Sequence, residues 1–337
     1  MRATLLAGVG AVALWLVPLR AAAECPSLPP LAEVVAQPIY SDPSGSQLDP
    51  KGLHRNQQLI QPLRDFTGAL TERADGEADE AALRCAGNLL REWGAAGAML
   101  RQPNGFPAIR ERQRFALGIT MAALKLGARG ASLDGTVAAW LHALDTAVAA
   151  DFARRHLTDN LAVWSAANAA SIALVDGDRA SLAYENAVWS EGLHQIGPDG
   201  YVPSELRRKS RALLYHQYYT SALLYLRALR SALGEPPTAR EDADLRRLID
   251  RVETALCDPK SMESASGGYP QEPPRPEQFA VGLVFGADLI DARWTRCGSK
   301  PLDLREDTLG GQLVGTFALL NRPRTAPSPG RPDDTLH

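Results

Sequence analysis

The chain has 337 residues, of which 45% are hydrophobic and 22% are charged, and this balance is ordinary for a globular protein with a sizeable core. A chain of this length could hold one large domain or two. The net charge of −3 argues against a general nucleic-acid-binding protein, so a site for a polyanion would have to come from a local cluster of arginines.

The first residues have the pattern of a targeting segment. Arg2 is followed by an apolar run over 3–18, and the small residues Ala21 and Ala23 are typical of a signal-peptidase site. The apolar run is short for a membrane span, which disfavours an uncleaved anchor. We therefore predict a signal peptide over 1–23, followed by an exported chain with no membrane anchor, in a Gram-negative periplasm.

Four cysteines remain after this cleavage, namely Cys25, Cys85, Cys257 and Cys297. An even count in an exported chain favours disulfides over thiol chemistry, and four cysteines allow three pairings. We favour Cys25 with Cys85 and Cys257 with Cys297, because each pair would tie one end of the chain to a nearby helix. No Cys-x-x-Cys sequence occurs, so we predict neither a metal nor a cofactor.

Prolines and a Ser-Gly-Ser sequence at 44–46 indicate a loop-rich N-terminal arm over 24–52. From Leu53 onward, alanine and leucine dominate, and apolar residues recur at helical spacing. The predicted helices span 53–70, 78–93, 109–127, 132–153, 159–175, 179–196, 204–233, 240–256 and 275–290.

The segments between these helices are short, which favours antiparallel neighbours, and no β-branched run is long enough to indicate a sheet. We therefore predict one all-α domain over 24–322 and a disordered tail over 323–337. An array of hairpins this long commonly closes into an α/α toroid with a groove across its top. The alternative is an open helical solenoid, although no fixed sequence period supports it.

Arginines and tyrosines share one predicted helical face within 203–219. Ser204 is a candidate N-cap, and Glu205 falls in the first turn, where negative charge is favourable. The face carries Arg208, Arg211, Tyr215 and Tyr218, with Tyr219 at its edge. A core face would not tolerate the arginines, and a solvated face would not need the tyrosines, so the pattern favours a cleft that binds an anion and moves a proton. The alternative is a surface helix whose arginines pair with acids elsewhere.

This stretch also resembles a known family. The sequence Glu-Leu-Arg-Arg-Lys-Ser-Arg-Ala-Leu-Leu-Tyr-His-Gln-Tyr over 205–218 is similar to the Glu-Leu-Lys-Arg…Arg-Ala-Leu-x-Tyr-His-x-Tyr signature of family-5 polysaccharide lyases, the periplasmic alginate lyases. The likeness extends upstream through 195–196 and 199–203. The resemblance implies an incomplete α/α toroid with the N-terminal arm over its cleft. It also implies an acidic polysaccharide as the partner of a monomeric protein.

A second part of the resemblance lies in 156–165, where the family has Asn-Asn-His-x-x-Trp. Asn160 and Trp164 match this pattern, whereas Leu161 stands in place of the histidine, which helps proton abstraction or binding in related enzymes. Thr158 is a candidate N-cap, which would place Asn160 in the first helical turn, where N–H groups can hold a carboxylate. Trp164 follows one turn later and is a candidate sugar platform.

β-Elimination of a uronate polymer requires a base for the C5 proton, an acid for the departing O4 and a group that neutralises the carboxylate. In D-mannuronate and D-glucuronate the proton and O4 leave from the same side, so one tyrosine can serve both, whereas L-guluronate needs a second group. We predict catalytic roles for Tyr215, for Arg208, which would favour the phenolate, and for Asn160, which would neutralise the carboxylate. The predicted substrate-binding residues are Trp164, Arg211, Tyr219 and Tyr269.

Two hypotheses follow from these residues. The first is a lyase for a mannuronate- or glucuronate-type polymer, favoured by Arg208 and Tyr215. The second is a catalytically weak or inactive lyase-like protein that binds an exopolysaccharide in the periplasm, favoured by Leu161. A glycoside hydrolase on a similar toroid is disfavoured because no pair of carboxylates stands out.

Overall fold

The structure is a computed structural model that describes residues 25–322 except 78, 156–157, 178, 275–278 and 299–302. The signal peptide predicted over 1–23 and the tail predicted over 323–337 lie outside the described residues. Within the described ranges, no helix is both long enough and apolar enough to span a membrane.

The regular structure of the described chain is almost entirely helical, which confirms the prediction of an all-α fold. The helices are α1 (Pro50–Leu59), α2 (Gln61–Asp75), α3 (Glu80–Ala95), α4 (Phe106–Ala128), α5 (Gly135–Ala153), α6 (Asn160–Asp176), α7 (Leu182–His194), α8 (Pro203–Leu206), the 3-10 helix η1 (Lys209–Arg211), α9 (Ala212–Ala232), α10 (Ala239–Cys257), α11 (Lys260–Ala265), α12 (Ala280–Phe285), α13 (Ala292–Arg296), the 3-10 helix η3 (Asp307–Leu309) and α14 (Leu313–Leu320). Two short strands, β1 (Arg305–Glu306) and β2 (Gly311–Gln312), pair antiparallel with Arg305 opposite Gln312.

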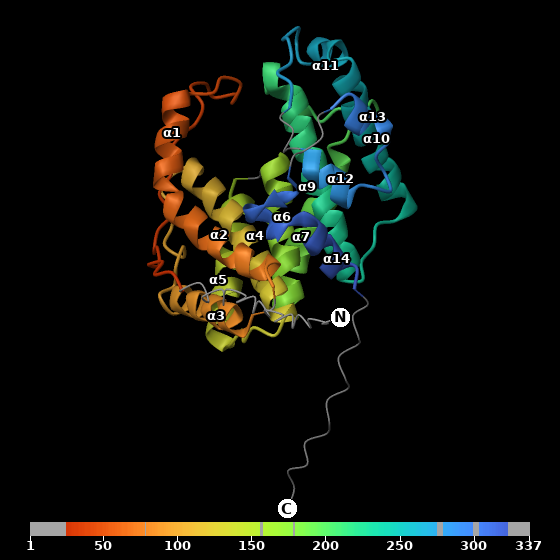
Figure 1. The fold of residues 1–337 in the computed structure, drawn as a ribbon. Coiled ribbons are helices and arrows are strands. Elements are labelled where there is room, and N and C mark those ends of the chain that lie inside the picture. The colour runs from red at the N-terminus through yellow and green to blue at the C-terminus, as the bar shows by residue number, and fades with distance from the viewer. Residues whose placement is uncertain are drawn as a thin grey trace, which may run out of the picture.

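The long helices form an inner and an outer layer. Helices α2, α4, α6 and α9 contact one another in that order, and α3, α5, α7 and α10 each pack against the inner helix that precedes them. The hairpins follow a curved array from the N-terminal helices on the left of the view to the C-terminal helices on the right (Figure 1). This arrangement is the predicted incomplete α/α toroid rather than an open solenoid.

The connections between the layers place one set of helix ends together. Each inner helix is linked to the next through an antiparallel outer helix, so the inner helices run parallel. The connectors over 96–105, 154–159 and 195–211, which lead into α4, α6 and α9, therefore meet at the same end of the toroid. Most of the residues that we predicted to be functional lie on these connectors or in the first turns that follow them.

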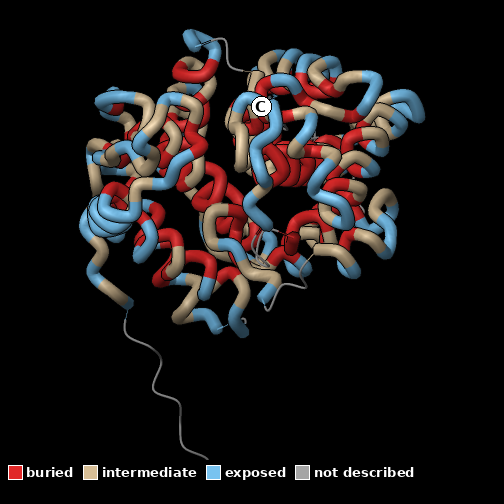
Figure 2. The backbone as a smooth tube through the Cα atoms, turned by 90° about the horizontal axis from the view of Figure 1, so that it is seen from above, coloured by how far each residue is buried: buried red, intermediate tan, exposed pale blue. Residues whose placement is uncertain are grey.

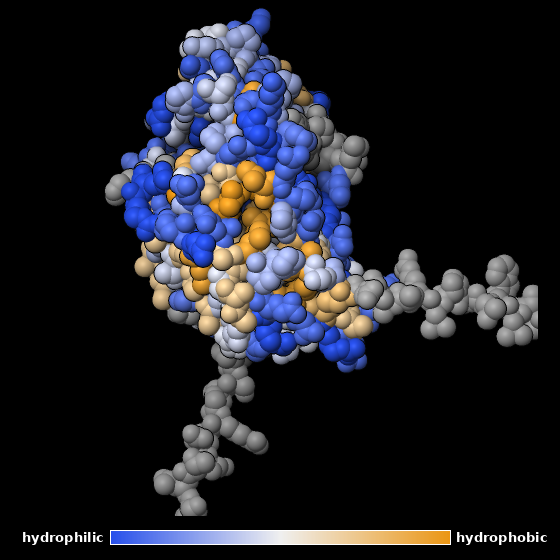
Figure 3. Space-filling model, turned by 90° about the vertical axis from the view of Figure 1, so that its left-hand side faces the viewer, coloured by the Kyte–Doolittle hydropathy of each residue, from blue (hydrophilic) through white to orange (hydrophobic). Residues whose placement is uncertain are grey.

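Buried residues gather on the sides of the helices that face one another (Figure 2). One apolar cluster lies around α2 to α5, where the rings of Phe66 and Trp93 stack with centroids 3.6 Å apart, and a second lies around α6, α9 and α10. The indole N–H of Trp93 donates to the carbonyl of Leu28 at 2.8 Å, which fixes the start of the N-terminal arm. On the side where the N-terminal elements lie, the surface is mostly hydrophilic around a small apolar patch (Figure 3).

Both predicted disulfides are present. Cys25 bonds to Cys85 and Cys257 bonds to Cys297, with Cα–Cα distances of 5.6 and 4.8 Å. The first ties the N-terminal arm to α3, and the second ties the end of α10 to the end of α13. No free cysteine remains among the residues that the structure describes.

Most predicted helices agree with the structure to within three residues, but three predictions need correction. The helix predicted over 53–70 is divided into α1 and α2, and the one predicted over 275–290 is reduced to the short α12. The helix predicted over 204–233 is broken between α8 and α9. At this break Lys209 adopts φ 54°, a left-handed conformation that residues other than glycine rarely adopt.

The break changes how the neighbouring side chains are placed. Ser204 is not an N-cap, because the cap of α8 is Val202, and the Ser204 hydroxyl makes no hydrogen bond within the described chain. Arg208 and Arg211 precede α9, so the turn rather than a continuous helical face determines their positions relative to Tyr215.

Candidate active site

Tyr215 lies in the first turn of α9, where the N-terminal arm covers it. The hydroxyl oxygens of Tyr215 and Tyr40 are 2.6 Å apart, and Tyr215 is only 8% exposed. The arm folds back on itself here, because Tyr40 forms a β-bridge with Leu48 and the carboxylate of Asp42 accepts from the backbone N–H of Gln47 at 2.6 Å. The arm therefore lies over the candidate site, as predicted, and brings a second phenol to it.

Two guanidinium groups lie against the ring of Tyr215. The Cζ atom of Arg208 is 4.4 Å from the ring centroid, and that of Arg211 is 5.7 Å from it. Arg211 also lies 5.1 Å from the ring centroid of Tyr40, and its Nε is 3.3 Å from a carboxylate oxygen of Glu272. These cation–π contacts join the arm to the start of α9 and concentrate positive charge around both phenols.

Arg208 also holds the arm directly. Its Nη1 donates to the carbonyl of Ser44 at 3.2 Å. A Cβ atom added to Gly45 would lie 2.7 Å from this Nη1, and Gly45 has φ 67°, so the close approach depends on a glycine at this position.

Arg208 also lies near two carboxyl groups, those of the buried Glu205 and the half-buried Asp159. Its Nη2 is 3.5 Å from Oδ2 of Asp159, and its Nε is 3.7 Å from Oε2 of Glu205. Burial raises the pKa of Glu205 to about 7, with a further rise caused by Asp159, while Arg208 and Asn160 act in the opposite direction. Burial also raises the pKa of Asp159, so this pair depends on Arg208 for its compensating charge.

Glu205 positions Asn160. One oxygen of Glu205 accepts from the backbone N–H of Asn160 at 2.9 Å and from its side-chain amide at 3.1 Å. The amide nitrogen carries two hydrogens, so this bond uses only one of them. The N-cap of α6 is Asp159 rather than Thr158, since the Asp159 carboxylate accepts from the N–H of Leu161. Asn160 is nonetheless the first helical residue, in the first turn as predicted.

The pKa of Tyr215 differs from the prediction. Burial raises this pKa, and the hydroxyl of Tyr40 raises it further, whereas Arg208 and Arg211 lower it. The guanidinium groups therefore act in the predicted direction, but burial outweighs them. The arrangement does not favour a phenolate, and the Tyr215 hydroxyl keeps its proton at neutral pH.

The next residues along α9 belong to the core. His216 is fully buried, its Nε2 accepts from the N–H of Val202 at 2.9 Å, and its Nδ1 lies 2.8 Å from the carbonyl of Ala212. Burial lowers the pKa of His216 to about 4, so the ring is neutral with its proton on Nδ1. Tyr219 is also fully buried, and its hydroxyl donates to the carbonyl of Gly192 at 3.0 Å. Tyr219 is thus a packing residue of the core, and its predicted role in binding substrate needs correction.

The remaining predicted residues surround this arrangement less closely. Trp164 is half-buried, and its ring centroid is 5.8 Å from that of the core residue Tyr225. Leu161 is half-buried against the apolar cluster of α2 to α5. Tyr269 is 43% exposed, in the loop after α11, and the Nζ of Lys209 is 5.5 Å from its ring centroid. Tyr269 therefore lies beside the break before α9.

Sequence reasoning missed three participants, Tyr40 on the arm and Gln271 and Glu272 on the loop after α11. Gln271 supports the break, because its side chain accepts from the N–H of Leu213 at 3.0 Å and donates to the carbonyl of Lys209 at 3.0 Å. Tyr40 lies in the predicted N-terminal arm, but no spacing rule links it to a residue 175 positions away.

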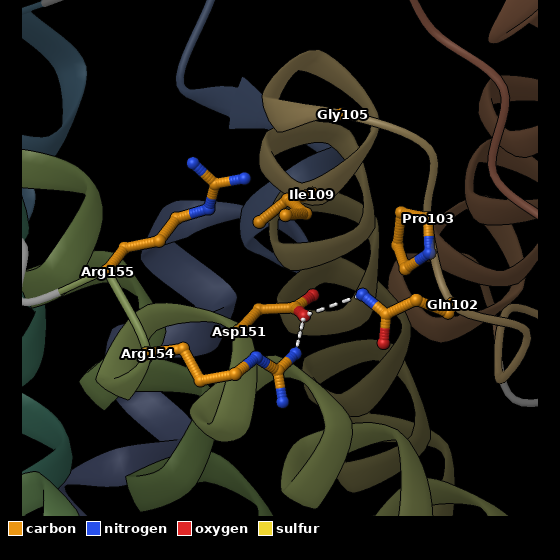
Figure 4. A pocket seen from close by; sticks show the side chains of 7 residues that line it. All are labelled: Gln102, Pro103, Gly105, Ile109, Asp151, Arg154 and Arg155. Atoms are coloured by element: carbon orange, nitrogen blue, oxygen red, sulfur yellow. Dashed lines mark hydrogen bonds and ion pairs between the residues drawn. The ribbon is translucent and has the colours of Figure 1, made fainter.

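A cavity of about 330 Å³ lies between the connector into α4 and the end of α5 (Figure 4). Its lining includes Gln102, Pro103, Ile109, Asp151, Arg154 and Arg155. None of the sequence-predicted site residues is among them. In the described part of the chain, no group of three or more histidines, cysteines, aspartates or glutamates could hold a metal ion.

Comparison with known proteins finds similarity to alginate lyases and other polysaccharide lyases. The family model described as alginate lyase matches residues 114–262, a segment that contains Asn160, Arg208 and Tyr215 but not Tyr40. A polysaccharide lyase of Stenotrophomonas maltophilia is 28% identical over 255 residues, which cover 73% of this chain and 77% of the relative. An alginate lyase of Pseudomonas aeruginosa is 26% identical over 325 residues, which cover 88% and 86%. These matches show that the chain is similar to alginate lyases and other polysaccharide lyases, and they support a polysaccharide lyase family member.

Solved alginate lyases have a fold similar to that of this chain. A variant of alginate lyase A1-III complexed with tetrasaccharide aligns with a TM-score of 0.72 at 17% identity, covering 89% of this chain and 86% of that chain. Alginate lyase A1-III from Sphingomonas species A1 aligns with a TM-score of 0.68 at 17% identity, covering 88% and 85%. These alignments support the assignment of the helical array as an incomplete toroid.

Proposed function

We propose that this protein is an alginate lyase family member that cleaves a mannuronate- or glucuronate-type acidic polysaccharide by β-elimination, with Tyr215 as both base and acid. The observation that carries the proposal is the surroundings of Tyr215. Two guanidinium groups lie against its ring, and one of them, Arg208, also lies near Glu205, which holds Asn160. Tyr40 covers the Tyr215 hydroxyl, so substrate reaches it only when the arm moves aside.

A protonated phenol can perform the elimination when both leaving groups are on one side of the sugar. As the C5–H bond breaks, its proton passes to the oxygen of Tyr215, and the phenolic proton passes to O4 of the departing unit. The C4–O4 bond breaks and a C4–C5 double bond forms. Tyr215 ends with one proton, as it began, so the raised pKa of its hydroxyl is compatible with catalysis.

Charge that develops at C5 spreads into the neighbouring carboxylate, which must be neutralised. We assign this role to the second amide hydrogen of Asn160 and to Arg208. Asn160 is fixed by two hydrogen bonds to Glu205, so it does not need to reorganise during the reaction. Arg211, Trp164 and Tyr269 are proposed to bind neighbouring units of the polymer.

The partner in this proposal is an acidic polysaccharide, and the protein acts as a monomer in the periplasm. The two disulfides support an exported location, because such bonds persist in oxidising compartments. No metal or cofactor takes part in the proposed steps.

Substrate choice provides the test. We expect wild type to produce the ultraviolet absorbance of unsaturated uronate from polymannuronate or polyglucuronate, and to cleave polyguluronate at least ~100-fold more slowly, since a second acid–base group contributes about that much. Leu161→His should change the rate on the D-uronate polymers by less than about tenfold, because Tyr215 already serves both roles. Leu161→Gln is the matched control for polarity and size without a titratable ring.

Equal cleavage of polyguluronate by wild type would contradict the single-tyrosine mechanism. So would a gain of more than about tenfold on D-uronates in Leu161→His alone, since it would show that an imidazole had been missing. If wild type binds these polymers but cleaves none, the alternative holds, in which the protein binds an exopolysaccharide without cutting it. Leu161 in place of the family histidine is the observation that favours this alternative.

A further inference from the structure

The cavity in Figure 4 lies at the start of α4, at the same end of the toroid as Tyr215 on α9, with the inner helix α6 between them. Its walls come from the connector into α4 and from the last turn of α5. The chain then continues from Arg155 to Asn160, so the connector between α5 and α6 has the cavity at its start and the Asn160–Glu205 pair at its end. A polymer lying across this end of the toroid could reach both.

The lining of the cavity carries excess positive charge. Its one carboxylate in the described residues, Asp151, is 1% exposed and already bonded to the buried Arg112, to Arg154 at 2.5 Å and to the amide of Gln102 at 3.2 Å. The guanidinium groups of Arg112 and Arg154 thus neutralise the Asp151 carboxylate, so the positive charge of Arg155 is in excess. The cavity is therefore suited to an anion rather than to a cation.

Arg155 is the cation of the lining that takes no part in this hydrogen-bond network. It is exposed, and it forms no ion pair with any residue in the described part of the chain. Its Cζ is 5.1 Å from the ring centroid of Phe106, at the start of α4, which supports the guanidinium from one side. Figure 4 shows the Arg155 side chain beside Ile109, apart from the hydrogen bonds that hold Asp151.

From this geometry we infer that the cavity is a second subsite, which binds the carboxylate of one uronate unit through Arg155. The inference rests on the proposed function, since the ligand is a distant unit of the same polymer. A volume of about 330 Å³ is at the small end of ligand sites and suits one sugar rather than an oligosaccharide. The planar guanidinium can hold a carboxylate with two parallel hydrogen bonds.

The length of the oligosaccharide substrate provides the test. With a series of oligomannuronates up to the polymer, Arg155→Ala should raise KM about tenfold for long chains, since a charge-assisted hydrogen bond is lost. The shortest cleavable oligomers should show no change, because they cannot reach the cavity, and kcat should stay within about twofold of wild type at every length. Arg155→Lys should restore only part of the affinity, because an ammonium group cannot make the paired hydrogen bonds.

Arg246→Ala is the matched control, since Arg246 is an exposed arginine on the outer helix α10 and its loss removes the same charge elsewhere. An unchanged KM for long chains in Arg155→Ala would overturn the subsite. An equal rise in Arg246→Ala, or an equal rise for the shortest oligomers, would also overturn it, because either result would indicate a general charge effect.

Calorimetric titration with the same oligomers separates this inference from the proposed function. If wild type binds long chains without cleaving them, and Arg155→Ala binds them about tenfold more weakly, the subsite stands while the lyase proposal fails. If cleavage is normal and Arg155→Ala binds long chains as wild type does, the subsite fails while the lyase proposal stands.

Discussion

Tyr215→Phe should lower kcat by roughly 10²- to 10⁴-fold, the usual contribution of a positioned acid–base group, while polymer binding stays within a few-fold of wild type. The ring remains in contact with Arg208 and Arg211, so the cation–π contacts that shape the site are retained. Only the oxygen that would carry both protons is removed. The measurement pairs the rate of unsaturated-uronate formation with the dissociation constant for the same polymer.

Tyr219→Phe is the matched control for this substitution. The two tyrosines are one turn apart on α9, and both hydroxyls make a hydrogen bond, but that of Tyr219 donates to Gly192 within the core. Tyr219→Phe should lower the free energy of unfolding by about 1 kcal/mol and leave kcat close to wild type. Full activity in Tyr215→Phe, or an equal loss in Tyr219→Phe, would contradict the role given to Tyr215.

Arg208→Ala should lower kcat/KM by roughly 100-fold or more, and it should also make stability depend strongly on pH. The substitution removes a cation that faces the Tyr215 ring on one side and the carboxyls of Asp159 and Glu205 on the other. Both carboxyls would then be buried without this compensating charge.

The sign of the pH effect follows from Glu205. Its pKa is about 7 in the folded protein and 4.5 as an unperturbed group, so the folded state binds more protons between these values. The free energy of unfolding therefore falls as pH rises through this window. Because Arg208 opposes the rise in this pKa, its removal should raise the pKa further and deepen the loss of stability.

Chemical denaturation of wild type and Arg208→Ala at about pH 5 and about pH 8 measures this effect, and the difference between the two proteins should be larger at the higher pH. Adding Glu205→Gln to Arg208→Ala should reduce the pH-dependent part of the loss, since the glutamine cannot ionise. Asp159 has a raised pKa as well, so a smaller dependence should persist in the double variant. An equal loss at both pH values would show that Arg208 does not compensate these carboxyls.

The fold could be predicted from the sequence because local sequence features determine it. Helical spacing of alanine and leucine and short connectors predicted the antiparallel hairpins, and an even number of cysteines led to the observed disulfides. The motif at 205–218 led to Tyr215 and Arg208, and in the structure Arg208 links the Tyr215 ring to Glu205, which holds Asn160.

The site was harder to predict where contacts between distant parts of the chain override the local sequence pattern. Helical periodicity placed Tyr219 at the edge of the functional face, but the break at Lys209 separates the arginines from α9, and Tyr219 falls in the core. The sequence pattern favoured Thr158 as the cap of α6, whereas the adjacent Asp159 is the N-cap in the structure. Tyr40 lies far away in the chain, and the upward pKa shift of Tyr215 comes from burial, which no local pattern encodes.

Cleavage of polymannuronate or polyglucuronate in water enriched in heavy oxygen, followed by mass spectrometry of the fragments, tests the proposed elimination most directly. Elimination breaks the C4–O4 bond without adding water. We therefore expect each cut to leave one unsaturated uronate end, with no solvent oxygen incorporated at the point of cleavage. Saturated fragments that carry the heavy oxygen would show hydrolysis, and intact polymer after prolonged incubation would show binding without cleavage; either result would contradict a lyase centred on Tyr215.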